Sequence, residues 1–238
     1  MVRKRIVLAA VCITLLALVG LAALALGPKT GYVFSDDGRT VTATRGPQFV
    51  TPTVRDPSLK TIAGNLSDYP YGIFFCCFGN TIAEGGSNFP FQTWVAIPFT
   101  PSANVTVTRI EASVGAFGGI TSGFELSLRA DNSGLPGKVI KSFHIAKPPQ
   151  YGACCTLDVG NDKTGIALTA GTQYWIAATT TSKDTNFLGG WAFNSTDMRS
   201  HPIASWCKGS STYCGSNSGK WVAGMSGDPL PAFAILGN

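Results

Sequence analysis

Alternation of hydrophobic and polar residues is clearest between residues 104 and 137. Over residues 124–130 every second residue is apolar, which is typical of a strand with one buried face. The stretch before it also alternates, but its apolar positions change face between Val107 and Ile110. We therefore predict two strands here, with a β-bulge near residues 108–109 that inserts one residue and reconciles the two faces.

The rest of the chain carries further short β signals. Residues 92–99 and 173–180 are apolar on both faces, as expected for strands buried between two layers. Additional strands are predicted at 138–145, 155–159, 187–193, 220–222 and 231–236. We predict an all-β protein, an antiparallel β-sandwich of jelly-roll-like form, although alternation alone does not separate this strand order from an immunoglobulin-like one.

The first 27 residues are predicted to be a targeting segment outside this fold. Basic residues at positions 3–5 precede an almost continuously apolar run, residues 6–26. A run of about 20 such residues can cross a bilayer, whereas Ala-Leu-Ala at 23–25 fits a cleavage site. The segment is either a cleaved signal peptide or an N-terminal hydrophobic helix that anchors the protein, and both predict export of the remaining chain.

Composition divides the exported part into two regions. Residues 28–58 are rich in Gly, Pro, Thr and charge. This composition predicts an extended spacer, and it is compatible with one edge strand within the spacer. Residues 59–238 are predicted to form the β-sandwich domain.

The formal net charge of +5 falls to +2 without the three leader cations (5 − 3 = 2). No basic patch remains, which argues against nucleic acid as a partner.

Six of the seven cysteines lie beyond the leader, and an even number in an exported chain predicts disulfides. Cys207 and Cys214 are spaced to close a short loop. The adjacent pairs, Cys76 with Cys77 and Cys154 with Cys155, form either vicinal bonds or bonds between the two pairs. We favour bonds between the pairs, because neighbouring strand residues point to opposite faces. A zinc site is disfavoured, since its cysteines are usually two to four residues apart.

The sequence offers little for catalysis, and we predict no enzyme activity. The two histidines, His144 and His201, lack metal-site spacing, and no nucleophile elbow or nucleotide-binding loop occurs. Glu111 and Glu125 lie on strands predicted to be adjacent, so a glycosidase-like carboxylate pair is conceivable, but solvent-facing residues are the simpler interpretation.

Two Asx-rich segments offer oxygen ligands for calcium. They are residues 131–133 and the group Asp158, Asn161 and Asp162. Ordinary turns explain the same residues equally well. We therefore predict no metal or other cofactor and keep calcium as the alternative.

The order of several short motifs resembles the bacterial choice-of-anchor R domain family. These motifs are Thr61-Ile62 with Asn65-Leu66, Pro98-Phe99-Thr100-Pro101, Gly134-Leu135-Pro136-Gly137, Cys154-Cys155 and Ala170-Gly171-Thr172-Gln173-Tyr174-Trp175. The resemblance covers roughly residues 58–238. It implies an exported β-sandwich attached to a surface, and it implies no activity. The sequence shows no C-terminal sorting motif, so the anchor expected from the resemblance is the N-terminal helix.

Aromatic residues suggest what such a domain would bind. Exported β-sandwiches often hold sugars by stacking aromatic rings on the pyranose face. Trp94 and Trp175 lie in two-faced strands and are predicted to be core residues. The candidate ligand-binding residues are those near loops of the C-terminal third: Trp191, Trp206, Tyr213 and Trp221. The alternative is that these rings only cover the end of the sandwich around a disulfide.

These observations predict a non-catalytic recognition or adhesion module that is secreted or tethered at the cell surface. Its expected partner is an extracellular polysaccharide or a surface protein, and its only membrane contact is through residues 6–26. The first alternative is a purely structural surface or matrix protein. A hydrolase acting on polysaccharide is a more distant one.

Overall fold

A computed structural model describes the backbone of residues 31–44, 48–49, 51–66, 74–86, 89–118, 120, 122–154, 156–195, 197, 203–224 and 229–238. For residues 48–49, 74–77, 154 and 213 only the backbone is described. The predicted leader therefore lies outside the described residues. Within them, no helix combines the length and the apolar character that crossing a membrane requires.

Strands make up most of the described chain, as the alternation predicts. They are β1 (Tyr32–Phe34), β2 (Thr40–Ala43), β3 (Gln48–Phe49), β4 (Lys60–Gly64), β5 (Phe74–Ala83), β6 (Gln92–Phe99), β7 (Val105–Ala112), β8 (Val114–Ala116), β9 (Phe124–Asp131), β10 (Pro136–Ile145), β11 (Ala153–Cys154), β12 (Asp158–Leu168), β13 (Tyr174–Thr179), β14 (Leu188–Asn194), β15 (Ile203–Lys208), β16 (Lys220–Gly224) and β17 (Phe233–Gly237). The helical elements among the described residues are short: α2 (Ser211–Cys214) and the 3₁₀ turn η1 (Gly215–Asn217).

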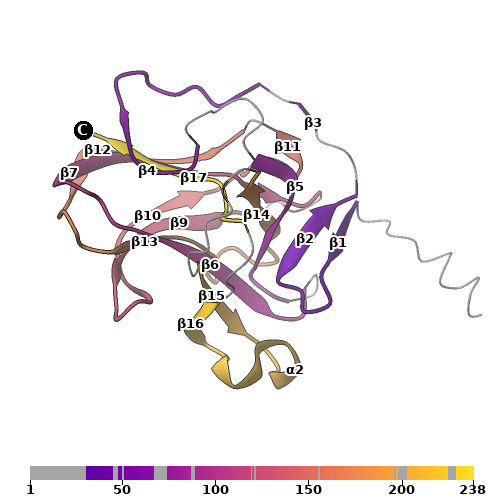
Figure 1. The fold of residues 1–238 in the computed structure, drawn as a ribbon. Coiled ribbons are helices and arrows are strands. Elements are labelled where there is room, and N and C mark those ends of the chain that lie inside the picture. The colour runs from indigo at the N-terminus through magenta and orange to yellow at the C-terminus, as the bar shows by residue number, and fades with distance from the viewer. Residues whose placement is uncertain are drawn as a thin grey trace, which may run out of the picture.

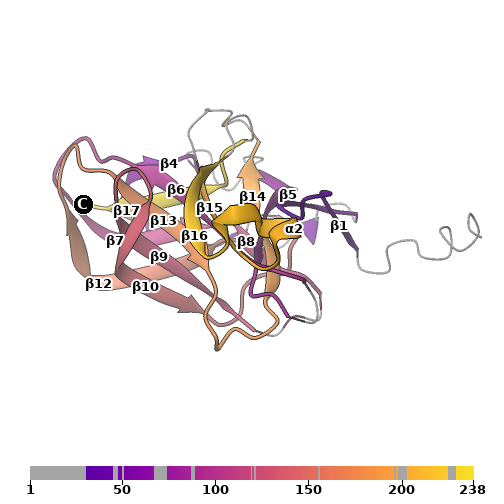
Figure 2. The ribbon, with the colours of Figure 1, turned by 90° about the horizontal axis from the view of Figure 1, so that it is seen from below.

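Two sheets pack face to face, so the chain is an all-β antiparallel sandwich, as predicted (Figure 1). The smaller sheet has the order β12-β7-β17-β4. The larger runs β1-β2-β5-β6-β13-β9-β10, with β14 beside β5 and β8, and β15 between β6 and β16. The hairpin of β15 and β16, with α2 at its tip, projects from the body and is seen end-on in Figure 2. A separate parallel pair joins β11 to β3.

The main core lies between the two sheets and follows the predicted inward faces. Phe124, Leu126 and Leu128 of β9 are fully buried against residues of β7 such as Ile110. The predicted bulge is confirmed. Leu236 of β17 pairs with Arg109 and Gly237 pairs with Val107, so Thr108 is the inserted residue. Val107 and Ile110 consequently both face the core.

The expectation that the two central strands are neighbours is wrong. Strand β7 belongs to the smaller sheet and β9 to the larger one. The connection between them is no simple turn, because it includes β8, which pairs with β14 of the larger sheet. The chain thus passes from one layer to the other, and residues on β7 and β9 meet across the core.

The predicted spacer contributes strands to the sandwich. Strands β1 and β2 pair with each other, and β2 pairs with β5. Val41 of β2 is fully buried, and the ring of Tyr32 stacks on Phe117 with 4.0 Å between centroids. The described part of residues 28–58 is therefore not only an extended linker, and the folded unit begins before residue 59.

Candidate functional site

Three tryptophans lie in register on three neighbouring strands. Trp206 of β15 is paired with Trp94 of β6 on one side and with Trp221 of β16 on the other. Residues directly opposite each other on antiparallel strands point to the same face, so the three side chains share the outer face of the larger sheet. The rings of Trp94 and Trp206 stack, with centroids 3.8 Å apart, and those of Trp94 and Trp221 are 6.2 Å apart. We call these three residues the tryptophan platform.

Small residues lie beside the platform on the same sheet. Ala96, Ala177 and Ala204 sit on neighbouring strands, are fully buried and form a small apolar cluster with Trp175. Trp221 packs against this cluster from outside. All three platform residues are partly buried, so part of each ring remains in contact with solvent.

The indole N–H groups divide the tryptophans into two classes. Those of Trp94, Trp175 and Trp191 donate to Thr180 Oγ1 (2.7 Å), Asp131 Oδ1 (2.7 Å) and the Ala232 carbonyl (2.9 Å). Those of Trp206 and Trp221 donate to no residue among those that the structure describes. Two hydrogen-bond donors at the edges of solvent-accessible aromatic rings are thus available to a ligand.

Polar side chains border the platform at its Trp94 end. Gln92 donates to Thr180 Oγ1 (3.3 Å) and to Glu84 Oε2 (2.6 Å). Lys208, which is exposed, lies opposite Gln92 in the pairing of β15 with β6. This border therefore presents amide, carboxylate and ammonium groups next to the rings.

An arginine lies at the Trp221 end. The guanidinium carbon of Arg129, on β9, is 5.8 Å from the Trp221 ring centroid. Its Nε donates to Ser127 Oγ (3.2 Å) and its Nη1 to the Gly137 carbonyl (3.3 Å). Burial removes water from the guanidinium and so lowers the pKa of Arg129, although the group stays charged.

The structure brings together only part of the predicted ligand-binding set. Trp206 and Trp221 meet on the platform. Trp191 does not, because it is fully buried in β14, and its assignment to a surface site is corrected. The side chain of Tyr213 lies outside those described. Trp94, predicted to be core, is instead a platform residue, and Trp175 is buried as predicted.

The predicted disulfide between Cys207 and Cys214 is present, with 5.4 Å between the two Cα atoms. It closes the loop that carries α2, and the Gly219 N–H bonds the Cys207 carbonyl at 2.7 Å. This clamp lies next to Trp206. The side chains of Cys76, Cys77, Cys154 and Cys155 lie outside those described, although β5 and β11, which carry three of them, are neighbours. Their pairing stays a prediction.

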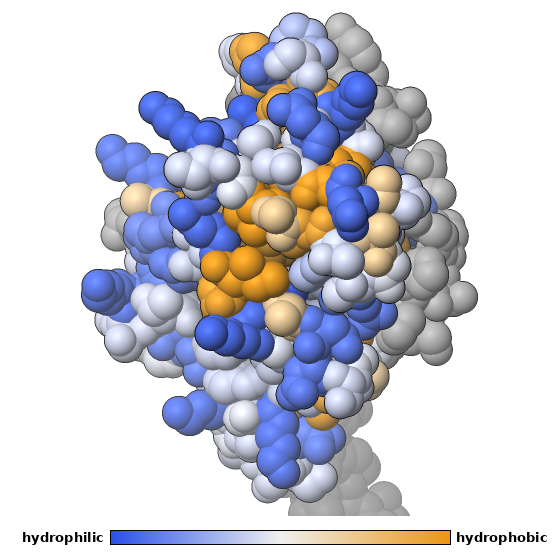
Figure 3. Space-filling model, turned by 90° about the vertical axis from the view of Figure 1, so that its left-hand side faces the viewer, coloured by the Kyte–Doolittle hydropathy of each residue, from blue (hydrophilic) through white to orange (hydrophobic). Residues whose placement is uncertain are grey.

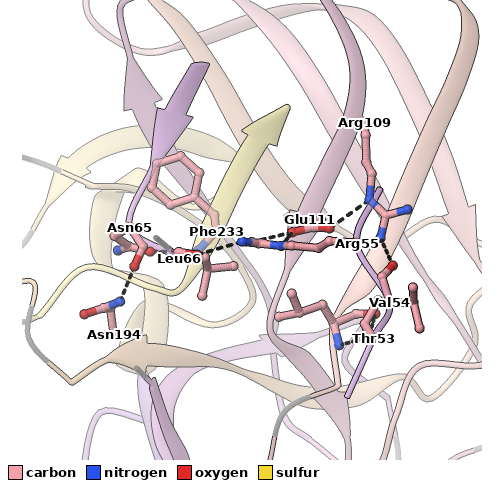
Figure 4. A network of polar contacts seen from close by, with 10 residues as sticks. Thr53, Val54, Arg55, Asn65, Leu66, Arg109, Glu111, Asn194 and Phe233 are labelled. Carbon is pink, nitrogen blue, oxygen red and sulfur yellow. Dashed lines mark hydrogen bonds and ion pairs between the residues drawn. The ribbon is translucent and has the colours of Figure 1, made fainter. Parts of the chain in front are cut away.

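The two candidate glutamates are far from forming a catalytic pair. Glu111 is fully buried in the smaller sheet between Arg55 and Arg109 (Figure 4). Glu125 lies on the outer face of the larger sheet, with Oε1 at 3.2 Å from Nδ1 of His144. The two glutamates lie on different sheets, so the glycosidase-like pair considered as the alternative is not formed, and the favoured interpretation that both face solvent is wrong for Glu111. His201 lies outside the described residues.

The aspartates considered as alternative calcium ligands are engaged by protein donors. Asp131 accepts hydrogen bonds from Gly134, Trp175 and Gln173, which lower its pKa. Asp158 accepts the Val114 N–H, yet burial raises its pKa well above the usual value and favours the protonated form. Asp162 accepts bonds within its own turn and pairs with Lys141. Among the described residues no three His, Cys, Asp or Glu side chains are grouped to hold a metal ion.

A second surface feature lies at the end of the sandwich that holds the C-terminus. Figure 3 shows apolar residues gathered in the middle of this face, with hydrophilic residues around them. A hollow of about 410 Å³ here is lined by Asn104, Val105, Thr106, Ala167, Leu168, Thr169 and Asn238. Its lining contains no ionisable and no aromatic side chain, so it offers no ring on which a ligand could stack. The tryptophan platform is therefore the better candidate site.

Comparison with known proteins gives no relative: no family model, no curated protein and no solved structure matches the chain.

Proposed function

We propose that the protein is an exported, non-catalytic recognition module that binds extracellular polysaccharide on the tryptophan platform. One observation carries this proposal. Trp206 and Trp221 are partly exposed on one face, and their indole N–H groups have no acceptor among the described residues. Indoles that only fill a core usually find an acceptor, as Trp175 and Trp191 do here.

The platform suits sugars for two physical reasons. A pyranose ring has a face of C–H groups that stacks on an aromatic surface, while its hydroxyls require donors and acceptors at the rim. The free indole N–H groups are donors, and Gln92, Glu84 and Lys208 supply further polar groups at one border. The adjacent disulfide closes the loop next to Trp206 and limits the conformations of this hairpin, which reduces the entropy lost on binding.

Location outside the cytoplasm is part of the proposal. It rests on the leader-like residues 1–27 and on the Cys207–Cys214 disulfide, which requires an oxidising compartment. The protein would be secreted or held at the membrane by residues 6–26. The resemblance to the choice-of-anchor R family points the same way and stays a prediction.

A purely structural surface role is the second candidate. The stacking of Trp94 on Trp206 favours it, because this contact braces the β15–β16 hairpin without any ligand. The two roles differ in what happens when a ring is removed: loss of a brace lowers stability alone, whereas loss of a platform residue lowers affinity.

The test is a binding screen with the full oxidised chain, in mild detergent if it stays in the membrane fraction. The probes are cellulose, chitin, dextran, alginate and polygalacturonate. Trp206→Ala and Trp221→Ala should each weaken binding about tenfold or more, as expected for aromatic hot spots. Trp191→Phe is the matched control, since its buried ring faces no ligand. Equal binding by all variants, or no binding to any probe, would contradict the proposal.

A further inference from the structure

Arg129 differs from the other arginines that the structure describes. Arg39 pairs with Asp37, and both Arg55 and Arg109 pair with Glu111. Arg129 has no ion pair with any described residue. A partly buried cation without an anion is costly, because burial removes water without supplying a counter-charge.

Only two of the three guanidinium nitrogens of Arg129 donate hydrogen bonds to described residues. Nε and Nη1 donate to Ser127 and Gly137, both neutral acceptors. Nη2 donates to no described residue. These two bonds fix the plane of the guanidinium over Trp221 and leave one N–H₂ group for a partner. A guanidinium held in this way recognises a carboxylate or sulfate oxygen with defined geometry.

None of the nearby carboxylates that the structure describes pairs directly with Arg129. Asp131 lies two residues along β9, but both of its oxygens accept bonds from Gly134, Trp175 and Gln173. Glu84 bonds Gln92 at the opposite border. Glu125 bonds His144, whose Nδ1 is also 3.6 Å from Asp184. Each of these acids is held by another donor, so none supplies Arg129 with a direct ion pair, although the Asp131 carboxylate contributes negative charge two residues away.

We infer that the ligand of the platform is an anionic polysaccharide, and that Arg129 binds its carboxylate or sulfate groups. The inference rests on the proposed function and names the class of sugar. A sugar ring stacked on Trp221 would place a substituent near the guanidinium, since Arg129 lies over the same indole. The anion then supplies the direct ion-pair partner that Arg129 lacks among the described residues, and the partial burial of Arg129 strengthens the attraction.

Two matched probe pairs test this inference. The first is polygalacturonate and its fully methyl-esterified form, which differ only in the charged carboxylate. The second is dextran sulfate and dextran. Binding is measured by isothermal titration or affinity electrophoresis in EDTA, which excludes calcium bridging, at two sodium chloride concentrations. We expect the charged member of at least one pair to bind about tenfold more tightly, and its advantage to shrink at high salt. The pair that shows the preference tells carboxylate from sulfate.

Variants assign the effect to Arg129. Arg129→Gln should abolish the preference for the charged probe, measured as the ratio of its affinity to that of the neutral probe, whereas Arg129→Lys should retain part of this ratio. Lys163→Gln, which removes an exposed charge from the smaller sheet, is the matched control. Melting temperatures show that each variant folds.

The outcomes separate the two proposals. Equal binding of charged and neutral probes, unaffected by Arg129→Gln but lost in Trp206→Ala, would overturn the anionic inference and leave polysaccharide recognition standing. Binding to none of these probes or those of the wider screen would overturn both.

Discussion

At the residue scale, Glu111 lies between two arginines on the smaller sheet. Its carboxylate is fully buried, with Oε1 at 2.8 Å from Arg109 Nε and Oε2 at 2.7 Å from Arg55 Nε (Figure 4). Arg55 also donates to the Leu66 carbonyl, and Arg109 to that of Val54. Through these bonds the segment before β4 is fastened to the outer face of the smaller sheet.

Removing this carboxylate should be strongly destabilising. Glu111→Ala leaves two largely buried guanidinium groups side by side, and we expect it to lower the free energy of unfolding by about 3 kcal/mol. Glu125→Ala is the control, because it removes a partly exposed contact with His144 and should cost no more than about 1 kcal/mol. Urea unfolding curves of both variants provide the measurement. Similar unfolding midpoints for the two variants would show that the contacts of Glu111 with Arg55 and Arg109 contribute little to stability.

Asp158 gives a pH-dependent prediction. Burial raises its pKa above the value of about 3.9 in the unfolded chain, and the Val114 N–H only partly opposes this. The folded state therefore favours the protonated acid. The stability that this group contributes is complete below its unfolded pKa and is lost as pH rises through its folded pKa.

Asp158→Asn should remove that loss, since an amide remains neutral. Relative to the original protein, the variant should gain melting temperature as the pH is raised from about 4 toward the folded pKa of Asp158, as followed by calorimetry. Other titrating groups cancel in the difference between the two proteins. A difference that stays constant over this range would mean that Asp158 ionises in the fold as readily as in the unfolded chain.

At the scale of elements, the β1–β2 hairpin is part of the folded unit. Val41 is fully buried at its inner face, while Val33 on the same hairpin is 48% exposed. Val41→Ala should lower the free energy of unfolding by about 2 kcal/mol, from lost apolar burial plus a small cavity. Val33→Ala should change it by less than about 0.5 kcal/mol. Equal, small effects in thermal or urea unfolding would instead support a loose spacer.

The alternation of hydrophobic and polar residues predicted individual strands, but it could not predict which strands pair. The alternation over residues 124–130 predicted both β9 and its buried side chains, and the change of face before Ile110 predicted the bulge at Thr108. Both follow from the backbone geometry of a single strand. Which strands pair is decided by contacts distant in sequence, so the separation of β7 from β9 into different layers left no local signal.

The glycines around Trp191 illustrate the same limit. Trp191 was predicted to lie near loops of the C-terminal third, although residues 187–193, with Gly189 and Gly190, were predicted to form a strand. In the fold a Cβ at Gly189 would lie 2.3 Å from the Gly115 carbonyl oxygen, and one at Gly190 would lie 2.4 Å from the Tyr151 ring. These residues are small because neighbouring groups pack directly on the strand. Gly-Gly therefore marks close packing here, and Trp191 is a core residue.

At the scale of the whole molecule, the candidate site is assembled from distant parts of the chain. Trp94 comes from the middle of the sequence, Trp206 and Trp221 from the C-terminal hairpin, and Arg129 from β9. Proximity to loops identified Trp206 and Trp221. It missed Trp94, because a strand that is apolar on both faces resembles a fully buried one. One face of β6 carries Val95 and Ile97 into the core, and the other carries Trp94 and Ala96.

Recognition by the platform is tested most directly by the indole N–H signals in a ¹H–¹⁵N correlation spectrum of the full oxidised chain. The five tryptophan signals are assigned by single Trp→Phe variants, and tetragalacturonate and cellotetraose are titrated in turn. Trp206 and Trp221 should exchange rapidly with solvent in the free protein and should shift when a sugar binds, while Trp175 and Trp191 stay protected and unshifted. Protected signals for Trp206 and Trp221 that neither sugar moves would contradict a ligand-binding platform and favour a structural brace.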